Sequence, residues 1–402
     1  MVPRRNKILS LKLTKDMLRY ALERGERERD YIPLFEKEAA GYLGVKYCAL
    51  VSSGRKGMEL VIKSFSLPKG SQIILPAYTL KDLPFLIKAL GYEPVFVDVE
   101  PGTGNMDPAL VGKKVNGSTA VIIPTHLFGL PCRIDEIQEI AKNKGIKVIE
   151  DCAHAFGADY KGRKAGTFGD AGFFSLELTK PINTFGGGLV ATNNKYIYDF
   201  IKKETSGYPK ATKRVFTKVI NSLVEDAVVH SPLYSLLGFL FYFDSTKKAF
   251  ANLYRGVHKS IRKSDSQYSN FQAYMGRIAL ARIDERNSGL FEKVKKLRGM
   301  LNKDISYPLA GYPYNPAFYH FIIRTKHNCE EIRKQLLKRG IDAGIKDEIT
   351  DNCPLYFGCA DQYPNANSFY NTAIQIPMSR EFRDSDLAAI AGKINDIVLK
   401  IA

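Results

Sequence analysis

Lys180 and Asp151 have the residue types and positions that amine chemistry needs. Lys180 comes just after an apolar run with the pattern of a buried strand, and the triplet Gly186–Gly188 follows it. Asp151 ends an earlier run of the same kind. Because ligands of open α/β sheets bind outside the carboxyl ends of the strands, the two side chains could face one ligand. A lysine that bonds an aldehyde and an acid that pairs with a pyridine nitrogen are the groups that pyridoxal phosphate (PLP) requires.

The stretch Ser52–Gly57 lies between a predicted strand and a predicted helix. Free amides at a helix N-terminus bind phosphate, Gly54 would let the backbone approach closely, and Ser175 could add a hydroxyl. The same residue types also occur in ordinary strand-to-helix turns. Gly186–Gly188 lacks the spacing of a dinucleotide fingerprint and instead predicts a tight turn that leads into the next strand.

Each candidate residue has a structural interpretation when it is taken alone. An aspartate such as Asp151 is often a helix cap, and a single histidine such as His154 is more often a core residue than a ligand. Lys180 is one of many lysines. Only the combination favours a reactive site.

Length, composition and charge limit how many domains the chain can form and which kinds of partner it can bind. A chain of 402 residues can hold two domains with full cores, and its hydrophobic content of 45% is ordinary. Its net charge of +17 is not ordinary and favours polyanions, nucleotide-linked substrates or an anionic membrane surface. No nucleic-acid-reading motif accompanies the charge, so we expect no nucleic-acid partner.

The six cysteines show no Cys-x-x-Cys spacing, which fits a reduced protein better than a disulfide scaffold or a zinc site. The basic N-terminus is not followed by an apolar stretch of signal-peptide length, and no run is long enough to span a membrane. We therefore expect no metal site and a cytoplasmic location.

From Tyr47 onward, short β-rich runs alternate with helical stretches, after two predicted helices at 14–30 and 31–43. This alternation predicts a mainly parallel seven-stranded sheet that is covered on both faces. The predicted strands are Tyr47–Val51, Gln72–Leu75, Pro94–Val97, Thr119–Ile123, Lys147–Ile149, Gly172–Ser175 and Gly188–Thr192.

We expect a large α/β domain at 1–264 and, at 265–402, a connecting helix with a smaller α+β domain. A long helix is predicted to start near Phe271 and to carry Arg277, Arg282 and Arg286. The smaller domain should contain strands at 318–323 and 374–376 and helices at 330–339 and 384–401.

An atypical insertion is predicted at about 205–262. Residues 202–263 hold twelve Lys and Arg against four acids, and they enclose the apolar, aromatic segment 232–243. As a helix this segment would be about 18 Å long, too short for a bilayer core of about 30 Å. It is suited to lying peripherally on an anionic membrane, such as the inner surface of the cell membrane, or equally to packing in a dimer interface or over the active site.

A set of motifs, read together, resembles the DegT-type sugar aminotransferases, which are fold-type I PLP-transferases. The resemblance runs from about residue 35 to 194 and is most specific at 146–192. It is loose in the C-terminal domain. The motifs are Ser53-Gly54, Pro76-Ala77-Tyr78-Thr79, Pro124–Gly129, Glu150–Ala155, Gly166–Asp170, Ser175 with Lys180, Gly187-Gly188 and Ser269–Ala273.

The resemblance implies a role for each site residue. Lys180 would bond the cofactor aldehyde, Asp151 would pair with the pyridine nitrogen, and His154 would contact the ring hydroxyl. Family members are homodimers with active sites at the subunit interface, and they move an amino group from glutamate to a keto group on a nucleotide-linked sugar. A lipid-linked sugar is a variant of this substrate. The phosphate would be held by Gly54, Arg55 and Ser175.

Three positions depart from the family pattern. Arg55, followed by Lys56, stands where the family has threonine, and Leu80 stands where it has a ring that stacks on the cofactor, a role that Tyr78 could take over. Asp265 falls in the run whose family asparagine reaches the partner's phosphate, and an acid there would repel it.

Two alternatives remain beside the aminotransferase. One is a degenerate relative that acts as a binding or assembly subunit. The other is a PLP enzyme that modifies sugars by a different reaction. Relatives that dehydrate sugars have histidine in place of the lysine, so Lys180 counts against that reaction.

Overall fold

The computed structural model describes residues 1–4, 7, 11–210, 212–231, 234, 265–308 and 314–401. Apart from Tyr234, the apolar segment 232–243 lies outside the described residues, and so does most of the expected insertion from 232 to 262. The membrane hypothesis for that segment therefore stays a prediction.

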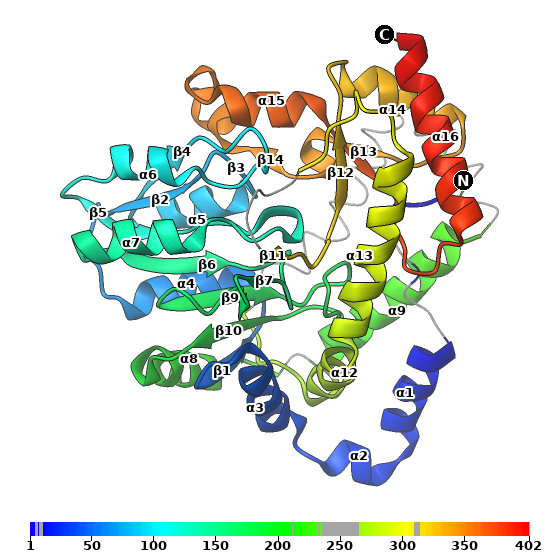
Figure 1. The fold of residues 1–402 in the computed structure, drawn as a ribbon. Coiled ribbons are helices and arrows are strands. Elements are labelled where there is room, and N and C mark those ends of the chain that lie inside the picture. The colour runs from blue at the N-terminus through cyan, green and yellow to red at the C-terminus, as the bar shows by residue number, and fades with distance from the viewer. Residues whose placement is uncertain are drawn as a thin grey trace.

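A seven-stranded sheet forms the centre of the large α/β part, as predicted (Figure 1). The strand order is β1-β10-β9-β6-β5-β2-β4. Strand β10 pairs antiparallel with both of its neighbours, and all other neighbours pair in parallel. The strands are β1 (Tyr47–Val51), β2 (Gln72–Pro76), β4 (Glu93–Val97), β5 (Thr119–Ile122), β6 (Lys147–Asp151), β9 (Ala171–Ser175) and β10 (Gly188–Thr192).

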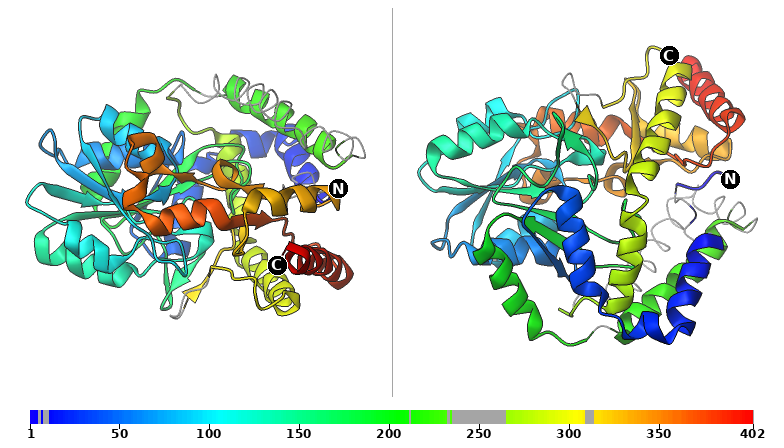
Figure 2. Two further views of the ribbon diagram at one scale, coloured as in Figure 1. Left: turned by 90° about the horizontal axis from the view of Figure 1, so that it is seen from above. Right: turned by 60° about the horizontal axis from the view of Figure 1, so that its bottom comes forward.

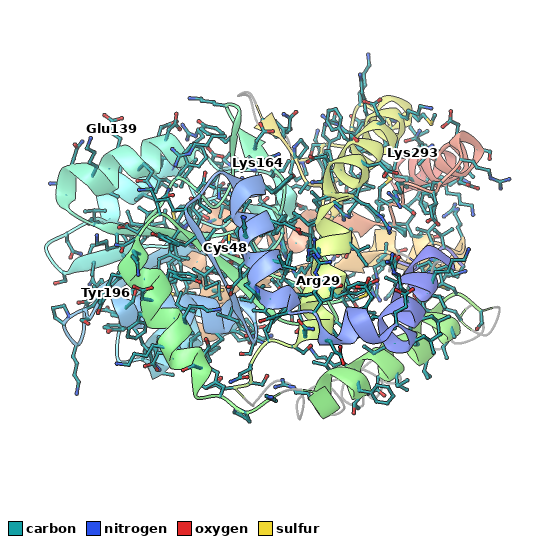
Figure 3. All side chains as sticks on the ribbon, turned by 90° about the horizontal axis from the view of Figure 1, so that it is seen from below. Arg29, Cys48, Glu139, Lys164, Tyr196 and Lys293 are labelled. Atoms are coloured by element: carbon teal, nitrogen blue, oxygen red, sulfur yellow. The ribbon has the colours of Figure 1, made fainter. Side chains whose placement is uncertain are left out.

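Helices cover both faces of this sheet, because alternate strand residues bury on opposite sides. In β1, Ala49 and Val51 join the core under one helical layer, whereas Cys48 and Leu50 join the core under the other. Figure 2 shows the layers from two further directions, and Figure 3 labels the exposed Tyr196 on the outermost helix of the first layer. That layer holds α4 (Gly54–Ser64), α5 (Asp82–Ala89) and α8 (Lys195–Ser206), and the other holds α3 (Tyr31–Leu43), α6 (Pro108–Lys114), α7 (Ile134–Lys144) and α12 (Asn270–Leu280).

The C-terminal part contains a separate three-stranded sheet in the order β12-β15-β13, with antiparallel pairing. Apolar side chains of α13, α14 and α16 pack on it in one cluster. Helix α13 runs alongside this sheet and leads back toward the large sheet (Figure 1). The elements are β12 (Phe321–Arg324), β13 (Gly344–Ile345), β15 (Ala373–Ile376), α13 (Ile283–Met300), α14 (Cys329–Lys338) and α16 (Asp384–Ile401).

Three predicted elements have different bounds. The helix at 14–30 is divided into α1 (Leu11–Leu22) and α2 (Arg24–Glu28), and the long helix from Phe271 is divided into α12 and α13. The second break falls at Arg282, whose backbone is not helical, and the acids Asp284 and Glu285 favour a new helix start there. The strand at 318–323 begins only at 321, because Phe318 has φ 38° and its neighbour Tyr319 donates to the carbonyl of Phe128 instead.

Several segments tie the C-terminal part to the rest of the chain. Strand β14 (Asp351–Asn352) pairs with β3 (Tyr78–Thr79), and α15 (Pro364–Thr372) packs on the large sheet. At the N-terminus, Val2 bridges to Ile341. The remaining elements are α9 (Thr212–Val229), β7 (Asp159–Tyr160), β8 (Arg163–Lys164), β11 (Tyr314–Asn315), η1 (Leu127–Gly129), η2 (Lys346–Glu348), η3 (Cys353–Phe357) and η4 (Ala360–Gln362).

No helix within the described ranges is long and apolar enough to cross a membrane.

Candidate active site

A cavity of about 1640 Å³ lies at the carboxyl edge of the large sheet, and residues of α12, α13 and the C-terminal part also line it. Strands β6 and β9 end at it, and so does the N-terminus of α4, because parallel strands and the helices that follow them present these ends to one edge. The cavity wall includes Gly54, Arg55, Asp151, His154, Ser175 and Lys180.

Asp151 is the last residue of β6 and is only 4% exposed. Its Oδ1 accepts the backbone N–H of Ala153 at 2.9 Å. Burial raises the pKa of Asp151, and the hydrogen bond from Ala153 and the charge of Lys180 oppose that rise. A buried carboxylate with a nearby cation is the environment that would hold a protonated pyridine nitrogen.

The preceding residue, Glu150, anchors the end of β6. It is fully buried, and its two oxygens accept four hydrogen bonds. The backbone N–H of Cys132 donates to Nδ1 of His126, so the proton of that ring is on Nε2, which donates to Glu150. The four donors are Nε2 of His126 (2.9 Å) and the backbone N–H groups of Gly166 (2.8 Å), Phe168 (2.6 Å) and Gly169 (2.8 Å).

His126, Glu150 and Cys152 also bring three potential metal ligands within 4.8 Å of one another. Both ring nitrogens of His126 and both oxygens of Glu150 are already used in hydrogen bonds. This cluster therefore acts as a structural support under Asp151.

Lys180 lies in the turn after β9, where its backbone N–H donates to the carbonyl of Glu177 at 3.0 Å. Its Nζ is 4.1 Å from the ring centroid of Tyr319. The Tyr319 hydroxyl is 2.8 Å from the Thr179 hydroxyl, so the phenol is joined to the same turn. The lysine amine is thus held against an aromatic face in the cavity, close enough to Asp151 for their charges to interact.

His154 stacks on the ring of Tyr319, the same ring that contacts Lys180. Its ring lies 4.2 Å from the Tyr319 ring with an interplanar angle of 21°. Burial lowers the pKa of His154 well below its usual range, and the charges of Lys180 and His320 lower it further. The backbone N–H of Phe128 donates to its Nδ1 at 3.4 Å. His154 is therefore a neutral imidazole with its proton on Nε2.

The expected phosphate site has the right local form. Ser53 caps α4 by accepting the N–H of Lys56 at 3.1 Å, and Gly54 opens the helix. A Cβ on Gly54 would lie 3.2 Å from the carbonyl oxygen of Phe174, so a side chain there would crowd the neighbouring strand. Ser175 ends that strand and lines the same part of the sheet edge.

Two departures from the family pattern meet in one ion pair. Nζ of Lys56 lies 2.9 Å from Asp265 and 2.6 Å from Glu59. Lys56 thus partly offsets the charge of Asp265 within this chain, and the expected repulsion between Asp265 and the partner subunit's phosphate stays a prediction. Arg55 lines the cavity, as its predicted phosphate contact requires. It also forms an ion pair with Asp82, so its guanidinium has a partner within the chain.

Tyr78 does not lie at the site, and the prediction that it could stack on the cofactor is wrong. It is fully buried and packs on Phe369, with ring centroids 5.7 Å apart. Successive strand residues point to opposite faces, and the neighbouring Thr79 faces the cavity. Leu80 lines the cavity and is 44% exposed.

Sequence reasoning missed the wall that comes from the C-terminal part. Tyr319 and His320 precede β12, Arg286 lies on α13, and Arg380 follows β15. None of them stands in a pattern that marks a site. The one available signal was the Tyr-His pair before a predicted strand.

The match to known families decides what kind of site this is. The model of the DegT/DnrJ/EryC1/StrS aminotransferase family matches residues 14–395. The chain belongs to this family. The assignment confirms the resemblance seen in the motifs, the expectation of an aminotransferase, and PLP as its cofactor.

Individual relatives differ in how much of the chain they match. A GDP-perosamine synthase of Escherichia coli O157:H7 is 39% identical over 170 residues, which are 42% of this chain and 47% of that protein. The match thus spans about half of that relative. A dTDP-3-amino-3,6-dideoxy-alpha-D-galactopyranose transaminase of Aneurinibacillus thermoaerophilus is 26% identical over 90% of this chain and 88% of its own.

Solved structures confirm the fold. The PLP form of a putative sugar aminotransferase from Streptococcus pneumoniae superposes with a TM-score of 0.76 at 19% identity, covering 100% of this chain and 99% of that one. The site described above also fits PLP by its own chemistry: a lysine, a buried carboxylate, a neutral imidazole and a helix N-terminus lie around one cavity.

Proposed function

We propose that this protein is a PLP-dependent aminotransferase that moves an amino group from glutamate to a keto group on a nucleotide-linked sugar. The observation that carries the proposal is the placement of Lys180 and Asp151 at neighbouring strand ends in one large cavity. The cofactor, when bound, supplies the electron sink for cleavage of a bond at the amine-bearing carbon.

The chain's own residues have separate roles in this proposal. Asp151 would keep the pyridine nitrogen of the bound cofactor protonated, and His154, whose pKa is lowered by burial, would contact the ring hydroxyl as a neutral hydrogen-bonding partner. Gly54, Arg55 and Ser175, which line the same cavity, would hold the phosphate. Lys180 would bond the cofactor aldehyde at rest, and its free amine would serve as the general base and acid that moves the proton of the amine-bearing carbon.

The substrate class rests on the relatives and on the cavity. Both relatives described above are named for nucleotide-linked sugars. A cavity of about 1640 Å³ has room for such a molecule beside the cofactor, and a net charge of +17 favours a substrate with a diphosphate. A lipid-linked sugar carries the same diphosphate chemistry and is the second candidate.

The alternative of a degenerate binding subunit is disfavoured because the site residues are not scattered. Lys180 and His154 both contact the ring of Tyr319, and Asp151 lines the same cavity. Hydrogen bonds hold Asp151 and its support Glu150 in place. A fold that served only assembly would not need this arrangement.

An absorption experiment tests the proposal. The purified protein with PLP should show a visible band, and glutamate should remove that band as the cofactor takes up the amino group. A nucleotide-linked keto-sugar should then restore it. A protein that binds PLP but whose band does not respond to any amino acid would not be an aminotransferase.

We also propose a homodimer, as the family resemblance implies, with residues 271–286, which form α12 and the first turn of α13, near the interface. The test is light scattering at micromolar concentration. A fully active monomer would contradict the proposal.

A peripheral membrane contact is the last part of the proposal, with 232–243 as its centre. Helix α9, which leads into that segment, exposes Phe216 (66%), Ile220 (43%) and Val224 (60%) on one face. This spacing gives an apolar stripe next to basic residues, which suits the headgroup region of an anionic membrane. Sedimentation with anionic liposomes should carry the protein down at low salt, and a Phe216→Glu/Val224→Glu variant should sediment less; equal, negligible binding of both would refute the contact.

A further inference from the structure

Arg286 on α13 lines the active-site cavity without a carboxylate partner among the described residues. Two neutral acceptors hold its guanidinium: Oδ1 of Asn287 at 2.7 Å and the carbonyl of Ala317 at 3.3 Å. Asn287 is itself fixed through the carbonyl of Phe156 at 3.1 Å. A guanidinium has five N–H donors, so these contacts orient the group and leave donors for a ligand.

Among the residues that the structure describes, none neutralises the charge of Arg286. Burial, together with the nearby Arg380, lowers the pKa of Arg286 to about 10. Arg4, which lines the same cavity, has carboxylate partners: it pairs with Asp342 at 3.0 Å and with Glu348 at 2.7 Å. Arg286 is partly buried, and a partly desolvated charge without a counter-charge is costly, so its site is suited to an anion that arrives with a ligand.

The neighbours of Arg286 indicate which anion this is. The carbonyl of Ala317, which accepts a hydrogen bond from Arg286, belongs to the residue two positions before Tyr319. The Tyr319 ring lies 4.1 Å from Nζ of Lys180, so Arg286 and the reacting amine line the same wall of the cavity. The α-carboxylate of an amino acid is one bond from the carbon that bears the amine. The phosphates of a nucleotide-linked sugar are separated from the keto carbon by part of the sugar ring. The position of Arg286 therefore suits the α-carboxylate better than a phosphate.

We propose that Arg286, with Arg380 beside it, is the subsite for the carboxylate of the amino donor. The planar guanidinium would bind the two carboxylate oxygens in a fork, and Asn287 and Ala317 hold it in the orientation for this. This inference deepens the proposed function by assigning the donor class, an α-amino acid, to named residues.

Calorimetric titration of the PLP-loaded protein tests the subsite without any turnover. The probes are glutarate, a dicarboxylate without an amine, and UDP, a nucleoside diphosphate. We expect Arg286→Gln to weaken glutarate binding about tenfold or more, because a charged hydrogen-bonded contact is lost. UDP binding should stay within about twofold. Arg286→Lys should give an intermediate loss, since it keeps the charge but not the fork.

Arg298→Gln is the matched control, because Arg298 lies on the same helix but outside the cavity and covers the ring of Tyr307. It should leave both affinities unchanged. Steady-state kinetics should show a raised KM for the donor in Arg286→Gln, with an unchanged rate for the half-reaction with the acceptor.

Three outcomes would overturn the inference. They are no glutarate binding to the unaltered protein, equal effects of Arg286→Gln on glutarate and UDP, or a loss of UDP binding alone, which would place a phosphate at Arg286. A protein that binds glutarate through Arg286 but does not transaminate would keep the subsite and refute the proposed function. The two claims are therefore distinguishable.

Discussion

Replacement of Glu150 by glutamine changes one oxygen to an NH2 group at the support under Asp151, and we expect a large loss of stability. One oxygen of the glutamine can still accept the two loop amides that Glu150 binds through Oε1. The new NH2 group would face the N–H of Gly166 and the Nε2–H of His126. The N–H of Gly166 and the Nε2–H of His126 would then point at another hydrogen-bond donor and lose their acceptor.

The magnitude follows from the number of groups left unpaired. Two buried donors lose their acceptor, and each such loss costs about 1–3 kcal/mol. The free energy of unfolding should fall by about 2–6 kcal/mol, which is a large part of the roughly 5–15 kcal/mol of a typical domain. The ring of His126 cannot relieve this by moving its proton, because Nδ1 already accepts from Cys132.

Urea denaturation of wild type and Glu150→Gln measures the difference. The matched control is Glu139→Gln, because Glu139 is an exposed glutamate on α7 (Figure 3). A surface change of this kind should stay within about 0.5 kcal/mol. If Glu150→Gln were as stable as the control, the assignment of the four hydrogen bonds and of the His126 proton would be refuted.

Two further predictions concern charge. Asp151→Asn should weaken PLP binding by about ten- to a hundredfold, since a charged contact to the pyridine nitrogen is lost, and a fluorescence titration showing wild-type affinity would exclude the role. The pKa of Asp342 is lowered because Arg4 and the Tyr234 hydroxyl outweigh burial, which alone would raise it. This stabilisation exists above the unfolded pKa of about 3.9 and is lost as pH falls through the folded pKa. Arg4→Gln should therefore be less stable than wild type at pH 7, by about 1–3 kcal/mol, with the gap closing below about pH 4, and a gap independent of pH would contradict this.

The large sheet could be predicted because its signal is local. Each strand is a continuous apolar run that ends at a polar residue, and Asp151 and Lys180 stand at or just after two such ends. Parallel topology then brings the ends to one edge without further information. The reactive pair could be found from the sequence for that reason.

The rest of the site depends on distant packing, which the sequence pattern does not encode. Tyr319 reaches Lys180 only because residues 317–319 bind the backbone at Phe128 and Gly129. Arg286 enters the cavity because the chain breaks at Arg282 and α13 takes a new direction.

The error at Tyr78 and the unforeseen ion pair at Asp265 both come from packing that the sequence pattern does not encode. The ring of Tyr78 has the chemistry for stacking, but strand alternation turns it into the core. Asp265 lies far from Lys56 in the sequence, so the ion pair that partly offsets its charge could not be foreseen.

The most direct test of the account is to find the lysine that bonds the cofactor. The PLP-loaded protein is reduced with borohydride, digested and analysed by peptide mass spectrometry. We predict the added mass on the peptide that contains Lys180, and no labelled peptide in a Lys180→Ala variant whose circular dichroism is unchanged. A label on any other lysine of the wild-type protein, or its persistence in Lys180→Ala, would contradict the central claim.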